Sequence, residues 1–411
     1  MNYSITAPSR IEAEINLPAS KSISNRVLII NALCGGNCHI SNIAECDDTA
    51  SMLSALASES NLINIGAAGT AMRFLTSYFS LCTGRTVVLD GTERMRHRPI
   101  KTLVDTLNAC GADIVYKNEA GFPPIEIHGR QYECGSISIA SNVSSQFISA
   151  ILMIMPVIGC RRLHLDGAVI SRPYIEMTLD VMKSFGVEST FEDADIILKD
   201  GARYKSPDEY KVENDWSAAS YWYAIQSLIP KSRISLRGLF KDSIQGDSRV
   251  AEIFRKLGVG SYSCGSYVDL HSESCSIGSL ELDLSGNPDL AQTIIVAACL
   301  LNKQFHITGL QTLKIKETDR LEALRTQLLK LGYVVKIEND EAMSWNGETI
   351  EPEERPVIDT FDDHRMAMAF APAAVNFPGL VIADVGVVGK SYPEFWKHLS
   401  GCGFVLKEVK L

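Results

Sequence analysis

The sequence predicts an α/β fold assembled from repeated units in which a strand is followed by a helix. Short segments that alternate apolar and polar residues, such as residues 11–17 (IEAEINL), are typical of half-buried strands. They alternate along the chain with apolar stretches of helical length. Several of these stretches, most clearly residues 366–375 (MAMAFAPAAV), are apolar nearly all round. Such helices are buried on every side, which favours enclosure by sheets over a place outside a doubly wound sheet.

The expected elements follow one another in a regular order. The strand at 11–17 precedes a polar motif (LPASKSISNR, 17–26) and an apolar run that predicts the first helix. Further helices are predicted to start at motifs that begin at Gly66, Arg98, Ser141, Ser171, Glu213, Gly286, Lys316 and Asp362. Strands are expected between them at RTVVLDG, SISIA, RLHLDG and HITGL. Neither the glycine pattern of a Rossmann site nor that of a P-loop follows any of these strands.

Composition and charge narrow the class of protein. The 411 residues are 46% hydrophobic and 21% charged, which is typical of a globular protein with two or three domains. The net charge of −10 argues against a nucleic-acid binder. No apolar run is long enough for a membrane span and no signal peptide is visible, so we expect a cytoplasmic protein. The eleven scattered cysteines predict reduced thiols, and no zinc pattern is present, so no metal is expected.

Several motifs combine hydroxyl or glycine residues with a basic side chain at an expected helix start. A helix N-terminus carries unpaired N–H groups and a partial positive charge, so such motifs suit phosphate or carboxylate groups. SKSISNR, GAAGTAMR and VSSQF have this character. For a single motif, N-capping by Ser20, Ser22 or Thr70 explains the pattern equally well. The recurrence of basic residues favours sites for small anions: Lys21, Arg26, Arg73, Arg98, Arg172, Lys316, Arg320, Arg365 and Lys390.

Carboxylates accompany three of the basic motifs. Asp289 follows a proline at an expected helix start, and Glu317 lies at helical spacing from Arg320. These two are the better candidates for a general base and a general acid. For the remaining carboxylates of the motifs, Asp319, Asp362 and Asp363, a salt-bridge role is the better interpretation.

The ordered set of motifs resembles the 5-enolpyruvylshikimate-3-phosphate (EPSP) synthase family. The set is LPASKSISNR, GAAGTAMR, ERMRHRPI, VSSQF, SRPYIEMTLDVMKSFGV, PDLAQT, IKETDRL, DDHRMAM and GKSYPEF, and it extends from Leu17 to Phe395. The resemblance implies transfer of the enolpyruvyl group of phosphoenolpyruvate to the 5-hydroxyl of shikimate 3-phosphate, with release of phosphate. It implies no metal and no organic cofactor, no nucleic-acid or membrane partner, and a monomer.

The resemblance also assigns residues to roles. Asp289 would take the proton of the 5-hydroxyl, and Glu317 would donate a proton to the methylene carbon, with Lys21 as its candidate partner. Shikimate 3-phosphate would be bound by Lys21, Ser22, Arg26, Ser144, Ser145, Gln146, Ser171, Tyr174, Asp289, Thr312 and Lys316. Phosphoenolpyruvate would be bound by Lys21, Gly69, Arg98, Gln146, Arg320, Arg365 and Lys390.

The fold implied by the resemblance is an inverse α/β barrel of two similar domains. Each domain would consist of three sheet-and-helix repeats around enclosed parallel helices. One domain would combine residues 1–19 with 214–411 and carry Asp289, Glu317, Arg365 and Lys390. The other, residues 20–213, would bind the phosphate of shikimate 3-phosphate. The active site would lie in the cleft between the domains.

The sequence departs from the common family pattern at a few positions. Ala67, Phe74 and Thr312 stand where many relatives have Asn, Pro and Asn, and Arg172 replaces a common Lys. Gly69 is retained, which implies an ordinary phosphoenolpyruvate pocket and binding of glyphosate.

Two other functions fit part of the pattern. A UDP-N-acetylglucosamine enolpyruvyl transferase would usually carry a cysteine shortly before Arg98, and DGTERMRHRP (90–99) has none. A non-catalytic protein that binds phosphorylated metabolites would have no need of Asp289 and Glu317 together.

Overall fold

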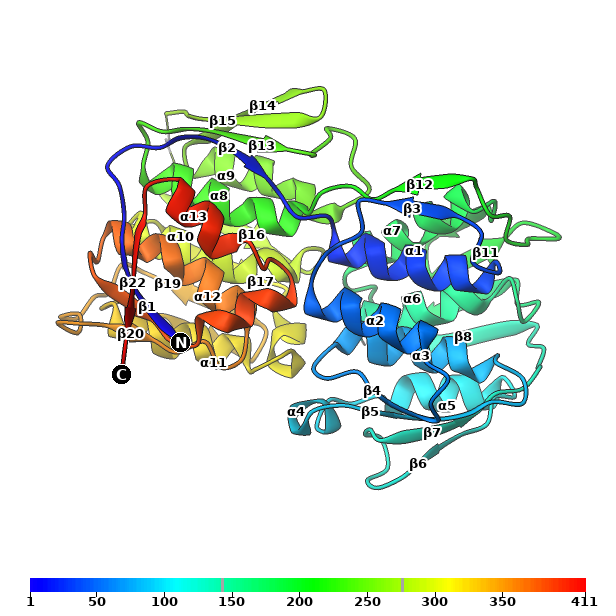
Figure 1. The fold of residues 1–411 in the computed structure, drawn as a ribbon. Coiled ribbons are helices and arrows are strands. Elements are labelled where there is room, and N and C mark those ends of the chain that lie inside the picture. Colours follow the sequence, from blue (N-terminus) through cyan, green and yellow to red (C-terminus); the bar gives the residue numbers. More distant parts are fainter. Residues whose placement is uncertain (142–143, 275–276) are drawn as a thin grey trace. The chain divides into compact units, whose positions relative to one another are not determined.

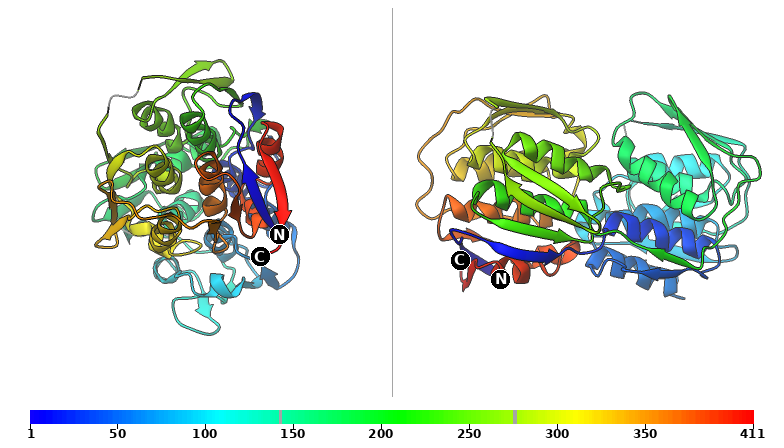
Figure 2. Two further views of the ribbon diagram at one scale, coloured as in Figure 1. Left: turned by 90° about the vertical axis from the view of Figure 1, so that its left-hand side faces the viewer. Right: turned by 90° about the horizontal axis from the view of Figure 1, so that it is seen from above.

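The computed structural model describes residues 1–141, 144–274 and 277–411, so Val143 of the VSSQF motif lies outside the described residues. The chain divides into two compact units. Unit 1 combines Met1–Ala19 with Glu213–Leu411, and unit 2 is Ser20–Val212. Both chain ends belong to unit 1, where the first and last strands pair side by side (Figures 1 and 2).

Unit 2 is built from sheets and from helices that pack on one another. Its four-stranded sheets have the orders β4 (Leu62–Asn64), β5 (Thr86–Asp90), β7 (Ile125–His128), β6 (Ile114–Tyr116), and β10 (Ser189–Glu192), β11 (Asp195–Leu198), β9 (Arg162–Asp166), β8 (Ser136–Ala140). A third sheet pairs β12 (Glu209–Lys211) with β3 (His39–Ser41). The helices are α1 (Lys21–Leu33), α2 (Asp47–Ala57), α3 (Gly69–Ser80), α4 (Glu93–Arg96), α5 (Lys101–Ala109), α6 (Ser145–Ile154) and α7 (Arg172–Ser184).

Unit 1 repeats this plan with four-stranded sheets. Their orders are β20 (Val357–Ile358), β21 (Leu380–Ile382), β1 (Asn2–Thr6), β22 (Val405–Val409); β14 (Val259–Cys264), β15 (Tyr267–Ser272), β13 (Arg233–Arg237), β2 (Glu12–Asn16); and β16 (Ser279–Asp283), β17 (Gln304–Thr308), β19 (Ala342–Trp345), β18 (Lys336–Glu338). The helices are α8 (Trp216–Leu228), α9 (Val250–Lys256), α10 (Ala291–Leu300), α11 (Arg320–Lys330), α12 (His364–Phe370) and α13 (Phe395–Gly401).

Each four-stranded sheet contains one parallel pair and two antiparallel pairs. The parallel pairs β4–β5, β8–β9, β16–β17 and β20–β21 are joined by crossovers that contain α3, α6, α10 and α12 respectively. Parallel strands need such a crossover, and its helix begins just beyond the carboxyl end of the first strand. The motifs GAAGTAMR, PDLAQT and DDHRMAM lie at these strand-to-helix turns, so the repeat places them at the N-terminal ends of α3, α10 and α12.

The enclosed helices predicted by the sequence are confirmed. Every residue of α10 and of α12 is buried, and α3 and α6 are buried over almost their whole length. One boundary differs from the prediction, because α12 ends at Phe370 and the chain continues to Val375 as a 3-10 helix. Pro372 has no N–H to donate within an α-helix and its ring clashes with the preceding turn. Among the described residues, no helix is long and apolar enough to cross a membrane.

Candidate active site

The N-terminal ends of several helices of unit 2 lie close together. At the starts of α1 and α2, Lys21 Nζ is 3.2 Å from Asp48 Oδ2. At the starts of α3 and α6, Gln146 Nε2 donates to Thr70 Oγ1 at 3.1 Å. Figure 1 shows these helices side by side. Their N-terminal dipoles add to the local positive charge, which makes this end of unit 2 suitable for anions.

Arg26 joins α1 to α6 and α7 from a buried position. Its guanidinium donates to Thr178 Oγ1 at 2.7 Å, to Ser149 Oγ at 3.1 Å, and to the carbonyl oxygens of Ser22 and Tyr174 at 2.8 and 3.1 Å. These partners are all uncharged. Burial therefore lowers the pKa of Arg26 from 12.5 to about 10, although the group stays cationic at neutral pH. The charge of Arg26 thus contributes to the positive potential of this end of unit 2.

Gly69 leaves room for the guanidinium of Arg98. A Cβ atom at residue 69 would lie 2.6 Å from Arg98 Nη1, which is closer than such atoms approach. Arg73 fixes both sides of this contact, since it donates to the carbonyl oxygens of Gly69 at 3.1 Å and Pro99 at 3.0 Å. Sequence reasoning named Arg73 as a basic residue but gave it no position in the site.

Hydroxyl groups of the motifs fall into two kinds. Ser20 caps α1, since its Oγ accepts from Ile23 N at 3.4 Å, and Ser144 caps α6 by accepting from Gln146 N at 3.3 Å. Thr70 lies inside α3, so its hydroxyl is not the N-cap that the alternative interpretation expected. Ser171 precedes α7 in the left-handed region at φ 57°, an uncommon conformation for a residue with a side chain.

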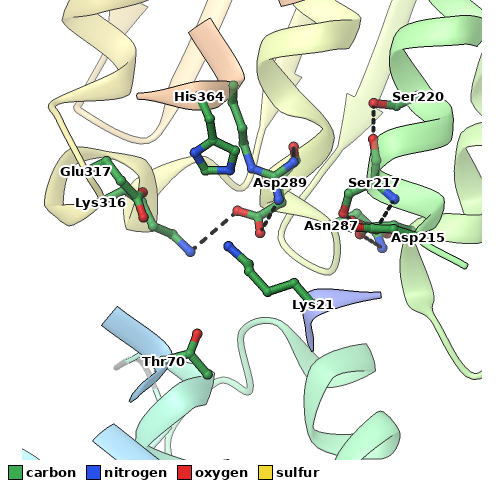
Figure 3. A network of polar contacts seen from close by, with 12 residues as sticks. Lys21, Thr70, Asp215, Ser217, Ser220, Asn287, Asp289, Lys316, Glu317 and His364 are labelled. Carbon is green, nitrogen blue, oxygen red and sulfur yellow. Dashed lines mark hydrogen bonds and ion pairs between the residues drawn. The ribbon is translucent and has the colours of Figure 1, made fainter. Parts of the chain in front are cut away.

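Unit 1 brings Asp289 together with three cations. Asp289 lies in the 3-10 turn Pro288–Leu290 that leads into α10, as predicted for a helix start. Its carboxylate is 2.9 Å from Arg365 Nη2, 3.1 Å from Arg320 Nη1 and 3.5 Å from Lys316 Nζ. Figure 3 shows the Lys316 ammonium directed at this carboxylate. Burial raises the pKa of Asp289, but the three cations outweigh it and hold that pKa well below its usual value of 3.8.

Glu317 lies in the loop before α11 and is paired twice. Its Oε1 is 3.0 Å from Lys390 Nζ, and its Oε2 is 2.9 Å from Arg320 Nη2. The sequence placed Glu317 at helical spacing from Arg320, whereas α11 begins only at Arg320. Asp289 and Glu317 are held in one ion-pair network because Arg320 contacts both carboxylates.

Arg320 is the centre of this network. It is 1% exposed, and its Nε donates to Asp363 Oδ2 at 2.7 Å in addition to its contacts with Asp289 and Glu317. Burial lowers its pKa, yet the three carboxylates raise that pKa above its usual value. The salt-bridge role predicted for Asp363 is confirmed, whereas Asp319 instead caps α11 by accepting from Glu322 N at 3.2 Å.

Polar contacts of Asn287, two residues before Asp289, were not anticipated from the sequence. Asn287 Nδ2 donates to Asp247 Oδ1 at 3.3 Å, and the Ser217 hydroxyl donates to the other oxygen of Asp247. Figure 3 shows Asn287 and Ser217 in this network. Burial and the nearby Asp289 raise the pKa of Asp247.

Thr312, a predicted substrate contact, is 8% exposed, and its hydroxyl has no hydrogen-bond partner in the described part of the chain.

The two units therefore differ in what they can do chemically. Unit 2 offers cations, hydroxyls and helix N-termini, which bind anions. Unit 1 adds carboxylates placed among cations, which is the arrangement for proton transfer next to a bound anion. Within residues 1–141, 144–274 and 277–411, no group of three or more His, Cys, Asp or Glu side chains is arranged to hold a metal ion.

Comparison with solved structures identifies the fold as that of EPSP synthases. Two structures of EPSP synthase from Acinetobacter baumannii match with TM-scores of 0.77 and 0.78 at 20% and 19% sequence identity. The matches cover 99% and 100% of this chain and the whole of each solved chain. The predicted α/β fold class is confirmed.

Sequence relatives identify the family. The family model described as EPSP synthase (3-phosphoshikimate 1-carboxyvinyltransferase) matches residues 5–58 and 55–399. A 3-phosphoshikimate 1-carboxyvinyltransferase of Bacteroides fragilis is 50% identical over 408 residues, which are 99% of each chain. Proteins of the same name are 38% identical in Idiomarina loihiensis, with 94% of this chain and 95% of the relative covered, and 34% identical in Vibrio campbellii, with 95% and 97% covered. The chain belongs to the EPSP synthase family.

Proposed function

We propose that the protein transfers the enolpyruvyl group of phosphoenolpyruvate to the 5-hydroxyl of shikimate 3-phosphate and releases inorganic phosphate. Its place would then be in the shikimate pathway, which leads to chorismate and the aromatic amino acids. The observation that carries the proposal is the placement of Asp289 and Glu317 on one buried arginine among further cations. The relatives named above are called by the name of this activity, and this chain matches them over nearly their whole length.

The addition step needs a base and an acid. The oxygen of the 5-hydroxyl forms a bond to C2 of phosphoenolpyruvate while its proton passes to Asp289. Glu317 delivers a proton to the C3 methylene, which becomes a methyl group. The cations Arg365, Lys316 and Lys390 hold the negative charges of the substrate while these protons move.

The elimination step reverses the proton transfer at C3. The bond between C2 and the phosphate oxygen breaks and phosphate leaves. Glu317 takes back one proton from the methyl group, so the double bond forms again. Because the same carboxyl serves both steps, Glu317→Gln should stop both the addition and the exchange of solvent protons into the methylene group.

Both units are needed for this reaction under the proposal. Unit 2 would bind shikimate 3-phosphate through Lys21, Ser22, Arg26, Ser144, Ser145, Gln146, Ser171 and Tyr174, with Thr312, Lys316 and Asp289 contributed by unit 1. Phosphoenolpyruvate would take Lys21, Gly69, Arg98 and Gln146 from unit 2 and Arg320, Arg365 and Lys390 from unit 1. The proposed domains are residues 1–19 plus 214–411 and residues 20–213, with the active site between them.

The retained Gly69 supports binding of glyphosate at the phosphoenolpyruvate site. Phe74 stands where the family commonly has Pro. It is fully buried, and the centre of its ring lies 5.4 Å from the Arg26 guanidinium carbon, so an aromatic ring packs on a cation at this position. We also propose that the protein is a cytoplasmic monomer. Light scattering after gel filtration tests the oligomeric state.

One assay separates the proposed function from its alternatives. Release of phosphate from phosphoenolpyruvate is measured with shikimate 3-phosphate or with UDP-N-acetylglucosamine as acceptor. Release with the first acceptor alone supports the proposal. Release with the second acceptor would indicate the sister transferase, and no release with either, together with binding of shikimate 3-phosphate, would indicate a non-catalytic binding protein.

A further inference from the structure

The carboxylates proposed for proton transfer hold cations that are proposed to bind the substrates: Arg365 and Lys390 for phosphoenolpyruvate, and Lys316 for shikimate 3-phosphate. Asp289 contacts Arg365 and Lys316, and Glu317 contacts Lys390. Arg320 and Asp363 complete the cluster. With four cations and three carboxylates, the cluster has one positive charge in excess, whereas phosphoenolpyruvate carries a phosphate and a carboxylate. An incoming anion must therefore compete with Asp289 and Glu317 for their partners.

We propose that phosphoenolpyruvate binds to unit 1 by exchanging ion pairs. Its phosphate and carboxylate take Arg365 from Asp289 and Lys390 from Glu317, and this exchange releases the two carboxylates for their roles as base and acid. The inference rests on the proposed function and adds to it a device that activates the base only when substrate is bound.

The electrostatics of Asp289 favour a change of this kind. In this structure its pKa lies well below 3.8 because Arg365, Lys316 and Arg320 outweigh the effect of burial. A carboxylate with so low a pKa is a weak base. When the anion takes Arg365, burial and the charge of the anion both raise the pKa of Asp289.

The exposure of the cations indicates which of them exchange. Lys316, Lys390 and Arg365 have side chains that are 22%, 9% and 8% exposed, whereas that of Arg320 is 2% exposed. Arg320 also donates twice to Asp363, at 2.7 and 3.4 Å. Arg320 is therefore the fixed point of the cluster: its proposed contact with phosphoenolpyruvate leaves its carboxylate partners in place, and the more accessible Arg365 and Lys390 are the cations that exchange.

Other titratable groups face the cluster and bear on its pH dependence. Asp247 faces Asp289 from the turn before α9, and its pKa is raised by burial and by Asp289. Tyr221 of α8 faces Arg365, and burial raises the pKa of its phenol to about 12, so it stays neutral over the range that matters. His364 Nδ1 is 3.5 Å from Asp363 Oδ1 at the start of α12.

The first test compares the affinity for phosphoenolpyruvate between variants by calorimetry. Asp289→Asn and Glu317→Gln remove a competitor, so each should bind phosphoenolpyruvate about tenfold more tightly while turnover is lost. Asp362→Asn is the matched control: Asp362 is exposed, and its φ of 55° is one that asparagine tolerates. It removes the same charge, but the affinity should stay within about twofold of wild type.

The second test uses sulfate, a dianion that does not itself titrate between about pH 5 and about pH 8. A ligand that raises the pKa of a carboxyl takes up protons when it binds, so its affinity increases as the pH falls. The affinity of wild type and of Asp362→Asn for sulfate should increase toward low pH, by up to about tenfold per pH unit. In Asp289→Asn this increase should be smaller, because the main carboxyl that takes up the proton is absent.

The outcomes separate this inference from the proposed function, since the sulfate experiment needs neither shikimate 3-phosphate nor turnover. Unchanged or weaker phosphoenolpyruvate binding in both Asp289→Asn and Glu317→Gln would overturn the exchange. Equal tightening in Asp362→Asn would also overturn it, because general electrostatics would then suffice. If the exchange is observed but shikimate 3-phosphate is not an acceptor, the proposed function fails while the exchange of anions in unit 1 stands.

Discussion

Two buried arginines show how differently the two units use positive charge. Arg26 in unit 2 donates only to uncharged oxygens, and burial lowers its pKa from 12.5 to about 10. Arg320 in unit 1 is still more deeply buried, but three carboxylates surround it and raise its pKa. Unit 2 thus keeps cationic charge available to an anion, whereas unit 1 neutralises most of its charge with groups that can move protons. The comparison suggests that unit 2 mainly binds and unit 1 mainly catalyses.

The largest expected effect is a split between turnover and binding. Asp289→Asn should lower kcat by about 10²- to 10⁴-fold, the usual worth of a general base, and should retain binding of both substrates. Ser145→Ala in unit 2 should instead raise KM for shikimate 3-phosphate about tenfold, with kcat changed little. Steady-state kinetics with each substrate varied in turn measures both. If Asp289→Asn changed KM alone, the assignment of chemistry to unit 1 would be wrong.

The next effect concerns stability and sharpens the comparison of the two arginines. Arg320→Met leaves three carboxylates without their shared cation, so the free energy of unfolding should fall by about 3–5 kcal/mol. Arg26→Met loses hydrogen bonds but leaves no charge unpaired, so a loss of about 1–2 kcal/mol is expected. Urea unfolding followed by circular dichroism gives both values. Equal losses would show that the partners of the two arginines do not differ in the way the structure indicates.

A smaller effect is expected where the backbone makes room for Arg98. Gly69→Ala places a methyl group against the guanidinium, so KM for phosphoenolpyruvate should rise about tenfold while KM for shikimate 3-phosphate changes little. Gly401→Ala at the end of α13 is the control, since a Cβ there meets no atom within 4 Å. A Gly69→Ala enzyme with wild-type KM for phosphoenolpyruvate would mean that Arg98 does not hold this substrate.

The smallest expected effect is on how the free energy of unfolding changes in acid, where two carboxylates of unit 1 act in opposite directions. The pKa of Asp289 is lowered in the folded protein, so its contribution is present above pH 3.8 and is lost as the pH falls below that value. The pKa of Asp247 is raised in the folded protein, so its ionised form destabilises the fold, and its protonation in acid removes this destabilisation. Asp289→Asn should make the loss of stability in acid shallower and Asp247→Asn should make it steeper, as measured by thermal unfolding between about pH 6 and about pH 3.

Sequence reasoning anticipated the features that depend on local order along the chain. Motifs such as GAAGTAMR and PDLAQT lie at helix starts because a parallel pair of strands needs a crossover, and the apolar helices are enclosed because no face of them is polar. The role of Asp363 as a partner of an arginine was also anticipated correctly.

Features that depend on contacts between distant segments were missed. Asp48, which pairs with Lys21, and Asp247, which lies behind Asp289, stand in segments without a recognisable motif. Nothing in the local sequence indicates that Asp247 becomes buried beside a second carboxylate. The left-handed conformation of Ser171 was also missed, because a serine, unlike a glycine, gives no local signal for a positive φ.

The most direct test of the account follows solvent deuterium into the methylene group of phosphoenolpyruvate and of the product. Wild-type enzyme, Glu317→Gln and Arg26→Met are each incubated with both substrates in D₂O, and incorporation is read by mass spectrometry. The account predicts incorporation by wild type, a loss of about 10²-fold or more in Glu317→Gln, and incorporation by Arg26→Met once shikimate 3-phosphate is saturating. Incorporation by Glu317→Gln at the wild-type rate would contradict the claim that unit 1 supplies the acid of the reaction.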